Sequence, residues 1–109
     1  MNVIGEVGGR NVVIFDDVIS TGKTVVRAAE ALVQQGAREI YVGATHPVFS
    51  GPAEEYLTSP VVREIVVTDS LPLPPNRKWD KVRVLTVSRL LGEAIRRIHE
   101  ERSLSSLFV

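Results

Sequence analysis

The stretch spanning residues 12–35 constrains the fold more than any other part of the chain. It begins with four apolar residues, 12–15, which predict a buried strand of a parallel sheet. Asp16 and Asp17 follow, and we expect them to end that strand. A loop of small residues then leads into a helix predicted over 23–35, closed by Gly36 at its carboxyl end. This strand–loop–helix order is typical of an α/β layer.

The rest of the sequence continues the alternation of strands and helices. Pro52 suits the first turn of a short helix, and the proline-rich stretch 71–75 predicts an extended connector. The last helix should turn Leu91, Ala94, Ile95 and Ile98 inward. The expected elements after the first helix are strands over 40–44, 64–68 and 82–87 and helices over 52–57 and 90–101. We therefore predict a single α/β domain over 1–109, with a doubly wound, mostly parallel sheet.

Charge and cysteine content narrow the possible functions. The chain has 13 Lys and Arg residues against 13 Asp and Glu residues, so its formal net charge is zero. That balance gives no support for a nucleic-acid or an anionic-membrane partner, and any bound anion must be held by local geometry. The sequence has no cysteine, which excludes disulfides and thiolate metal sites. Without an apolar run at its start, the chain is expected to be cytoplasmic.

The loop before the first helix has the composition of a phosphate-binding site. The first N–H groups of a helix have no partner within it, and the helix dipole favours an anion there. Ser20, Thr21 and Thr24 add hydroxyl donors, and Gly22 allows close approach of the backbone. Lys23 is expected to contribute its backbone N–H before its ammonium group. These residues predict a phosphate cradle that needs no net positive charge.

Asp16 and Asp17 cannot serve the phosphate, because like charges repel. Adjacent carboxylates at a strand end suit the vicinal hydroxyls of a sugar, which makes a pentose phosphate the expected ligand. A magnesium ion bound partly through water is a second possibility. A third reading, that the two acids only form a polar strand end before a helix cap, stays open.

A nucleotide-binding P-loop is the rival interpretation of Gly22, Lys23 and Thr24. That motif requires a glycine five residues before the glycine of its Gly-Lys pair. Asp17 stands at that position here, next to Asp16. Two carboxylates would face the triphosphate, so the spacing argues against a P-loop.

Two aromatic residues outside this loop have more ordinary explanations. His46 has no acid beside it in the sequence, and we expect a structural or interface role in preference to a catalytic one. Trp79 lies in the connector and is expected to pack or to meet a partner, not to stack on a base.

The chain also resembles a known family. Residues 12–24, VVIFDDVISTGKT, resemble the PRPP-binding signature of the type I phosphoribosyltransferase fold. Three later segments resemble ribose-phosphate diphosphokinases (PRPP synthases), in the same order and over essentially the whole chain. They are AAEALVQQGAREIYVGATHPVFSGPA, IVVTDSLPLP and LLGEAIRRIHEERSLSSLF. The chain is thus similar to the carboxyl-terminal domain of a PRPP synthase, a partial phosphoribosyltransferase-like domain.

The resemblance implies a role for each matching residue. Asp16 and Asp17 would hold the ribose hydroxyls, and the cradle residues the 5-phosphate of ribose 5-phosphate or PRPP. The implied reaction transfers a diphosphoryl group from Mg-ATP to the 1-hydroxyl of ribose 5-phosphate. Ser103 and Ser105 match a pair that helps form a regulatory phosphate or ADP site between subunits. The family also implies Mg²⁺, with Asp16 and Asp17 as candidate ligands, and homo-oligomers.

The resemblance also implies missing parts. The family's ATP contacts and catalytic loop lie in an amino-terminal half that this sequence lacks. Its first residues match an internal segment of the family, so we expect the chain to begin within a longer protein and to be inactive alone. Two alternatives remain: a compact phosphoribosyltransferase that uses PRPP, and a non-catalytic module that associates with PRPP synthases.

Overall fold

Four parallel strands form the centre of the molecule. The computed structural model describes residues 7–107, and its sheet has the order β1-β2-β3-β4, with every neighbouring pair parallel. The elements are β1 (Val12–Ile19), α1 (Lys23–Gln34), β2 (Ile40–Pro47), α2 (Ala53–Leu57), β3 (Val62–Thr68), β4 (Val82–Leu85), α3 (Ser88–His99) and a short 3₁₀ turn, Ser105–Leu107. The predicted α/β class with a parallel sheet is confirmed. No helix within the described range is long and apolar enough to cross a membrane.

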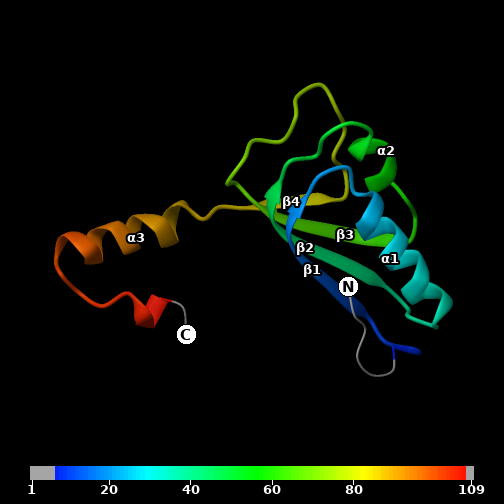
Figure 1. Ribbon diagram of the computed structural model, residues 1–109, viewed down its shortest axis with the longest axis horizontal. Coiled ribbons are helices and arrows are strands. Elements are labelled where there is room, and N and C mark those ends of the chain that lie inside the picture. The colour runs from blue at the N-terminus through cyan, green and yellow to red at the C-terminus, as the bar shows by residue number, and fades with distance from the viewer. Residues whose placement is uncertain (1–6, 108–109) are drawn as a thin grey trace.

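The core lies between the sheet and α1. Alternate residues of the strands point to one face, where Ile14, Val42 and Ile65 are buried. The apolar stripe of α1 packs on that face through Val26, Ala29 and Leu32, at the spacing of successive helical turns. Figure 1 shows α1 and α2 on the same side of the sheet. The described residues therefore supply one of the two helical layers that a doubly wound sheet has.

The last helix does not contribute to this core. In Figure 1, α3 projects away from the sheet on an extended connector. None of its residues is buried, and the exposed fractions of Leu91 and Ile95 are 55% and 67%. The prediction that Leu91, Ala94, Ile95 and Ile98 point inward is therefore wrong within residues 7–107, because the sequence pattern shows an apolar stripe but not the surface that it meets.

Several strands run further than predicted. Parallel pairing of β1 with β2 continues past the apolar run, with Asp16 opposite Ala44 and Val18 opposite His46. The prediction that Asp16 and Asp17 end the first strand is therefore wrong, since both lie inside β1. Likewise, β2 runs on to Pro47 and β3 begins two residues earlier than predicted, whereas β4 is shorter than predicted and ends at Leu85. Main-chain pairing, which side-chain polarity does not reveal, sets these ends.

The connector between β3 and β4 is tied to the core by Trp79. Its ring lies 4.8 Å from that of the buried Phe49, centroid to centroid, and its indole N–H donates to the Pro74 carbonyl over 3.1 Å. The expected packing role of Trp79 is confirmed. Lys81 ends the connector by donating to the carbonyl oxygens of Ser59 (2.6 Å) and Val62 (2.7 Å).

Candidate functional site

A small hollow opens where β1 passes into α1. Its volume is about 190 Å³, and its lining includes most of the predicted cradle: Asp16, Ser20, Thr21, Gly22 and Thr24. The carboxyl end of β1 and the amino end of α1 meet there, the usual place for a ligand in a parallel sheet. The fold thus brings one carboxylate, three hydroxyls and a helix N-terminus to one point.

Gly22 fixes the geometry of this loop. Its φ of 82° lies in the left-handed region, and it caps α1 without any side-chain hydrogen bond. A Cβ at this position would lie 2.7 Å from Cδ2 of the buried Leu57. Only glycine satisfies both conditions, so the loop can pass tightly over Leu57 of α2.

Two main-chain hydrogen bonds hold the loop against the segment after β2. The Phe49 N–H donates to the Ile19 carbonyl over 3.1 Å, and the Ser50 N–H donates to the Ser20 carbonyl over 2.9 Å. These bonds fix the position of Ser20 before any ligand is present.

The amides at the start of α1 are mostly available. The Lys23 N–H has a long bond, 3.3 Å, to the Thr21 hydroxyl. Within residues 7–107, the N–H groups of Gly22 and Thr24 have no acceptor. The first amides of a helix have no partner within it and lie at the positive end of its dipole, so these amides are suited to an incoming anion.

The two acids of β1 are exposed and lie side by side. The Asp17 N–H donates to Oδ1 of Asp16 over 2.8 Å, and the Val18 N–H donates to Oδ1 of Asp17 over 2.9 Å. A side-chain hydrogen bond with Asp16, followed by the backbone N–H groups of Asp17 and Val18, lowers the pKa of Asp17 below its ordinary value. The Asp17 carboxylate therefore remains charged well into the acid range.

Asp17 and Lys23 do not line the hollow. Asp17 stands beside it, next to Asp16, and Lys23 is exposed, with no ion pair from its ammonium group to any acid of residues 7–107. The five residues Asp16, Ser20, Thr21, Gly22 and Thr24 come together as the sequence predicted.

The fit of a divalent cation can be judged from the carboxylates. The described part of the chain contains no group of three or more His, Cys, Asp or Glu that could hold a metal. Asp16 and Asp17 are still a suitable pair for Mg²⁺, which keeps several waters and often uses only one or two carboxylates together with substrate oxygens. Each carboxylate has one oxygen engaged by a backbone N–H, which orients the other.

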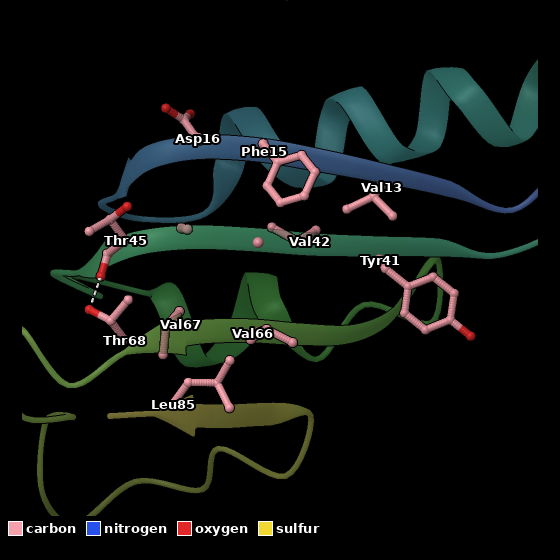
Figure 2. A pocket seen from close by; sticks show the side chains of 12 residues that line it. Val13, Phe15, Asp16, Tyr41, Val42, Thr45, Val66, Val67, Thr68 and Leu85 are labelled. Atoms are coloured by element: carbon pink, nitrogen blue, oxygen red, sulfur yellow. Dashed lines mark hydrogen bonds between the residues drawn. The ribbon is translucent and has the colours of Figure 1, made fainter. Parts of the chain in front are cut away.

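Polar residues at the ends of β2 and β3 form a second cluster that the sequence analysis missed in part. The Thr68 hydroxyl donates to the Thr45 carbonyl over 2.7 Å, as Figure 2 shows. Ser70 donates to the same carbonyl over 3.2 Å, and its Oγ lies 2.8 Å from Nδ1 of His46. The expected structural role of His46 is consistent with this contact. Thr68 and Ser70 could have been found, because they end a strand parallel to β1 and so share its edge of the sheet.

The predicted regulatory pair lies elsewhere. The hydroxyls of Ser103 and Ser105 are 2.9 Å apart. Arg97 of α3 donates to the Ser103 carbonyl over 3.4 Å and also contacts the Ser106 hydroxyl. Both serines follow α3, away from the sheet, and the structure does not bring them to the hollow (Figure 1). The last two residues, Phe108 and Val109, make the sequence apolar at its end and lie outside the described residues.

The sheet face opposite α1 carries a wide apolar depression of about 500 Å³. Figure 2 shows Val13 and Phe15 of β1, Tyr41 of β2 and Leu85 of β4 lining it. The exposed fraction of Phe15 is 82%, and its ring lies over Gly43, where a Cβ would come within 3.0 Å of it.

Comparisons with known proteins agree with one another. A family model described as "Phosphoribosyl synthetase-associated domain" matches residues 1–109. The chain is 52% identical over 108 residues to a ribose-phosphate pyrophosphokinase of Caldanaerobacter subterraneus, covering 99% of this chain and 34% of the relative. It is 48% identical over 108 residues to the enzyme of that name from Gloeobacter violaceus, covering 99% and 32%.

A solved structure has the same fold. The crystal structure of phosphoribosylpyrophosphate synthetase from Mycobacterium smegmatis superposes with a TM-score of 0.84 at 35% identity, covering 90% of this chain and 33% of that one. The chain therefore spans about a third of the length of the curated relatives that it matches.

Proposed function

This chain belongs to the family of phosphoribosyl synthetase-associated domains, and on that premise we propose that it is the ribose-5-phosphate-binding domain of a ribose-phosphate diphosphokinase. The reaction proposed for the whole enzyme moves a diphosphoryl group from ATP to the 1-hydroxyl of ribose 5-phosphate. We place the chain at the carboxyl-terminal side of that enzyme, on the order in which its segments resemble PRPP synthases.

One observation carries the proposal: open amides and hydroxyls at the start of α1 lie in the same hollow as the Asp16 carboxylate. The amides and hydroxyls suit a phosphate, and the carboxylate suits neutral hydroxyls. A pentose phosphate presents both kinds of group a few bonds apart. A free phosphate would use only the amides and hydroxyls, and an uncharged sugar would use only the carboxylate.

The residues of the chain act by positioning. The Gly22 and Thr24 amides and the loop hydroxyls hold the 5-phosphate, while Asp16 and Asp17 hold the ring hydroxyls. The sugar is then fixed at both ends, with its 1-hydroxyl directed toward the diphosphoryl donor. In-line transfer needs such orientation and neutralisation of charge more than covalent help from the protein.

Magnesium fits this arrangement through Asp16 and Asp17. When bound, Mg²⁺ neutralises charge on the transferred phosphates. Asp16 and Asp17 would hold the ion, and they would also accept hydrogen bonds from the sugar hydroxyls.

We further propose that this chain alone does not make PRPP, because it spans a third of the length of its relatives and the family resemblance implies that the ATP contacts lie in the rest. An assay with radiolabelled ATP and ribose 5-phosphate tests this on the isolated chain. We expect no PRPP above background. Robust PRPP formation would contradict the proposal that the ATP contacts lie outside this chain.

Calorimetry with ribose 5-phosphate tests the site itself. Asp16→Ala and Asp17→Ala each remove a charge-assisted acceptor, so Kd should rise about tenfold to a hundredfold, equivalent to about 1.5–3 kcal/mol. Glu30→Ala is the matched control, since it removes an exposed carboxylate of α1 that does not line the hollow. Unchanged affinity in both aspartate variants would remove the assignment of the sugar hydroxyls.

A further inference from the structure

Phe49, in the segment after β2, has an unusual backbone conformation for a bulky residue. Its φ of 48° lies in the left-handed region, where every side chain is crowded by its own backbone. Such strain persists only where the surrounding structure compels it, and it is found most often beside functional sites. The exposed fraction of Phe49 is 2%, so its ring is fixed by its neighbours.

The main chain of this segment holds the loop that lines the hollow. The Phe49 N–H donates to the last carbonyl of β1 over 3.1 Å, and the Ser50 N–H donates to the Ser20 carbonyl over 2.9 Å. Gly51 lies against Thr21, since a Cβ on Gly51 would be 3.9 Å from Cγ2 of Thr21. Both Ser20 and Thr21 line the hollow. Because φ and ψ of Phe49 set the angle between the two N–H groups, a change of φ would separate at least one of them from its acceptor.

The side chain of Phe49 is held by the connector between β3 and β4. Its ring lies 4.8 Å from the ring of Trp79, centroid to centroid. Arg77 of the same connector donates to the Gly51 carbonyl over 3.3 Å. The Lys78 N–H donates to a carboxylate of α2 over 3.0 Å. Of the described residues of this connector, none lines the hollow.

From these contacts we infer that Phe49 is a positioning residue for the phosphate end of the proposed site, kept in its left-handed conformation by packing on Trp79. The connector thereby sets the position of Ser20 and Thr21 without touching the ligand. The inference deepens the proposed function and rests on it, because the hollow must first bind a sugar phosphate. A residue that only filled the core would change stability and leave phosphate affinity unchanged.

Phe49→Ala and Phe49→Gly separate positioning from packing, because both remove the ring. Alanine is unfavourable at a φ of 48°, so without the ring its backbone should relax to a negative φ and release the loop. Glycine adopts this φ readily, so the two N–H groups should keep their acceptors. Calorimetry with inorganic phosphate and with ribose 5-phosphate should give a Kd about tenfold higher in Phe49→Ala for both ligands, and a clearly smaller rise in Phe49→Gly.

Three further variants serve as controls. Val62→Ala removes packing from the same core at the amino end of β3, away from the hollow, and should lower the urea midpoint without changing either Kd. Trp79→Ala should weaken both ligands as Phe49→Ala does, whereas Trp79→Phe keeps a ring and should bind like the parent chain. Circular dichroism checks that each variant is folded. Trp79 is only partly buried, so Trp79→Ala decides the matter if Phe49→Ala does not fold.

Hydrogen exchange at the Ser50 N–H tests the same point without a ligand. Exchange there should be faster in Phe49→Ala than in Phe49→Gly, and the difference should exceed that at the Ile65 N–H, which donates to the Lys81 carbonyl. Equal Kd values in the parent chain and Phe49→Ala, or an equal loss in the alanine and glycine variants, would overturn the inference. A parent chain that binds neither ligand would contradict the proposed function. Equal exchange in the two variants would then overturn the inference as well.

Discussion

Replacement of Gly22 by alanine tests how the loop at the start of α1 is built. Alanine at a φ of 82° costs about 1–2 kcal/mol relative to glycine. The new Cβ would also lie 2.7 Å from Cδ2 and 3.0 Å from Cγ of Leu57. Leu57 is buried, and forcing extra volume into a packed site costs about 1–3 kcal/mol. The two effects together predict a loss of about 2–5 kcal/mol in the free energy of unfolding.

Gly51→Ala is the control that separates backbone strain from the steric clash. Gly51 also has a positive φ, 56°, but a Cβ there meets only Cγ2 of Thr21, at 3.9 Å. Alanine at this position should therefore show the conformational cost alone, about 1–2 kcal/mol. Both variants would be compared with the parent chain by urea unfolding followed by circular dichroism.

The urea midpoints decide between the two explanations. With a slope of about 2 kcal/mol per molar urea, Gly22→Ala should lower the midpoint by about 1–2.5 M and clearly more than Gly51→Ala does. Equal shifts would refute the argument that Leu57 closes the loop. Phosphate binding should also weaken in Gly22→Ala, because a displaced loop moves the amides of the cradle.

Three further predictions concern stability. Lys81→Met should cost about 1–3 kcal/mol in thermal unfolding, because the Ser59 and Val62 carbonyls lose their donor. A hydrogen bond from the Thr86 side chain, and a smaller effect from the Val87 N–H, lower the pKa of the Asp69 carboxyl below its ordinary value of 3.8. The contribution of Asp69 to stability is therefore present above that pH and is lost as the pH falls further. Asp69→Asn should flatten the rise in urea midpoint between about pH 2 and pH 5; an unchanged slope would contradict this. Trp79→Phe should cost about 1 kcal/mol by thermal unfolding, for the lost bond to Pro74.

The placement of the residues proposed as a phosphate cradle could be predicted from the sequence because its determinants are local. Ser20, Thr21, Gly22 and Thr24 stand directly before and within the first turn of a helix whose apolar spacing is clear. Unpaired amides at that place follow from helix geometry alone. The structure places all four in one hollow with Asp16.

Features that depend on distant contacts could not be predicted in the same way. Asp16 and Asp17 look like a strand end, yet pairing with β2 extends β1 to Ile19. The apolar stripe of α3 was visible in the sequence. The direction of the helix, however, depends on the segment between β4 and α3, where the Val87 N–H donates to the Asp69 carboxylate. The close contact of Gly22 with Leu57 likewise joins residues far apart in the chain.

The order of the elements along the chain has a consequence for how the molecule can change. The hollow is lined by residues 16–25, and Leu57 lies against its loop. The exposed helix α3 comes later in the sequence, at Ser88–His99. The hollow and the exposed helix are thus encoded in separate stretches, and either can vary while the other is kept.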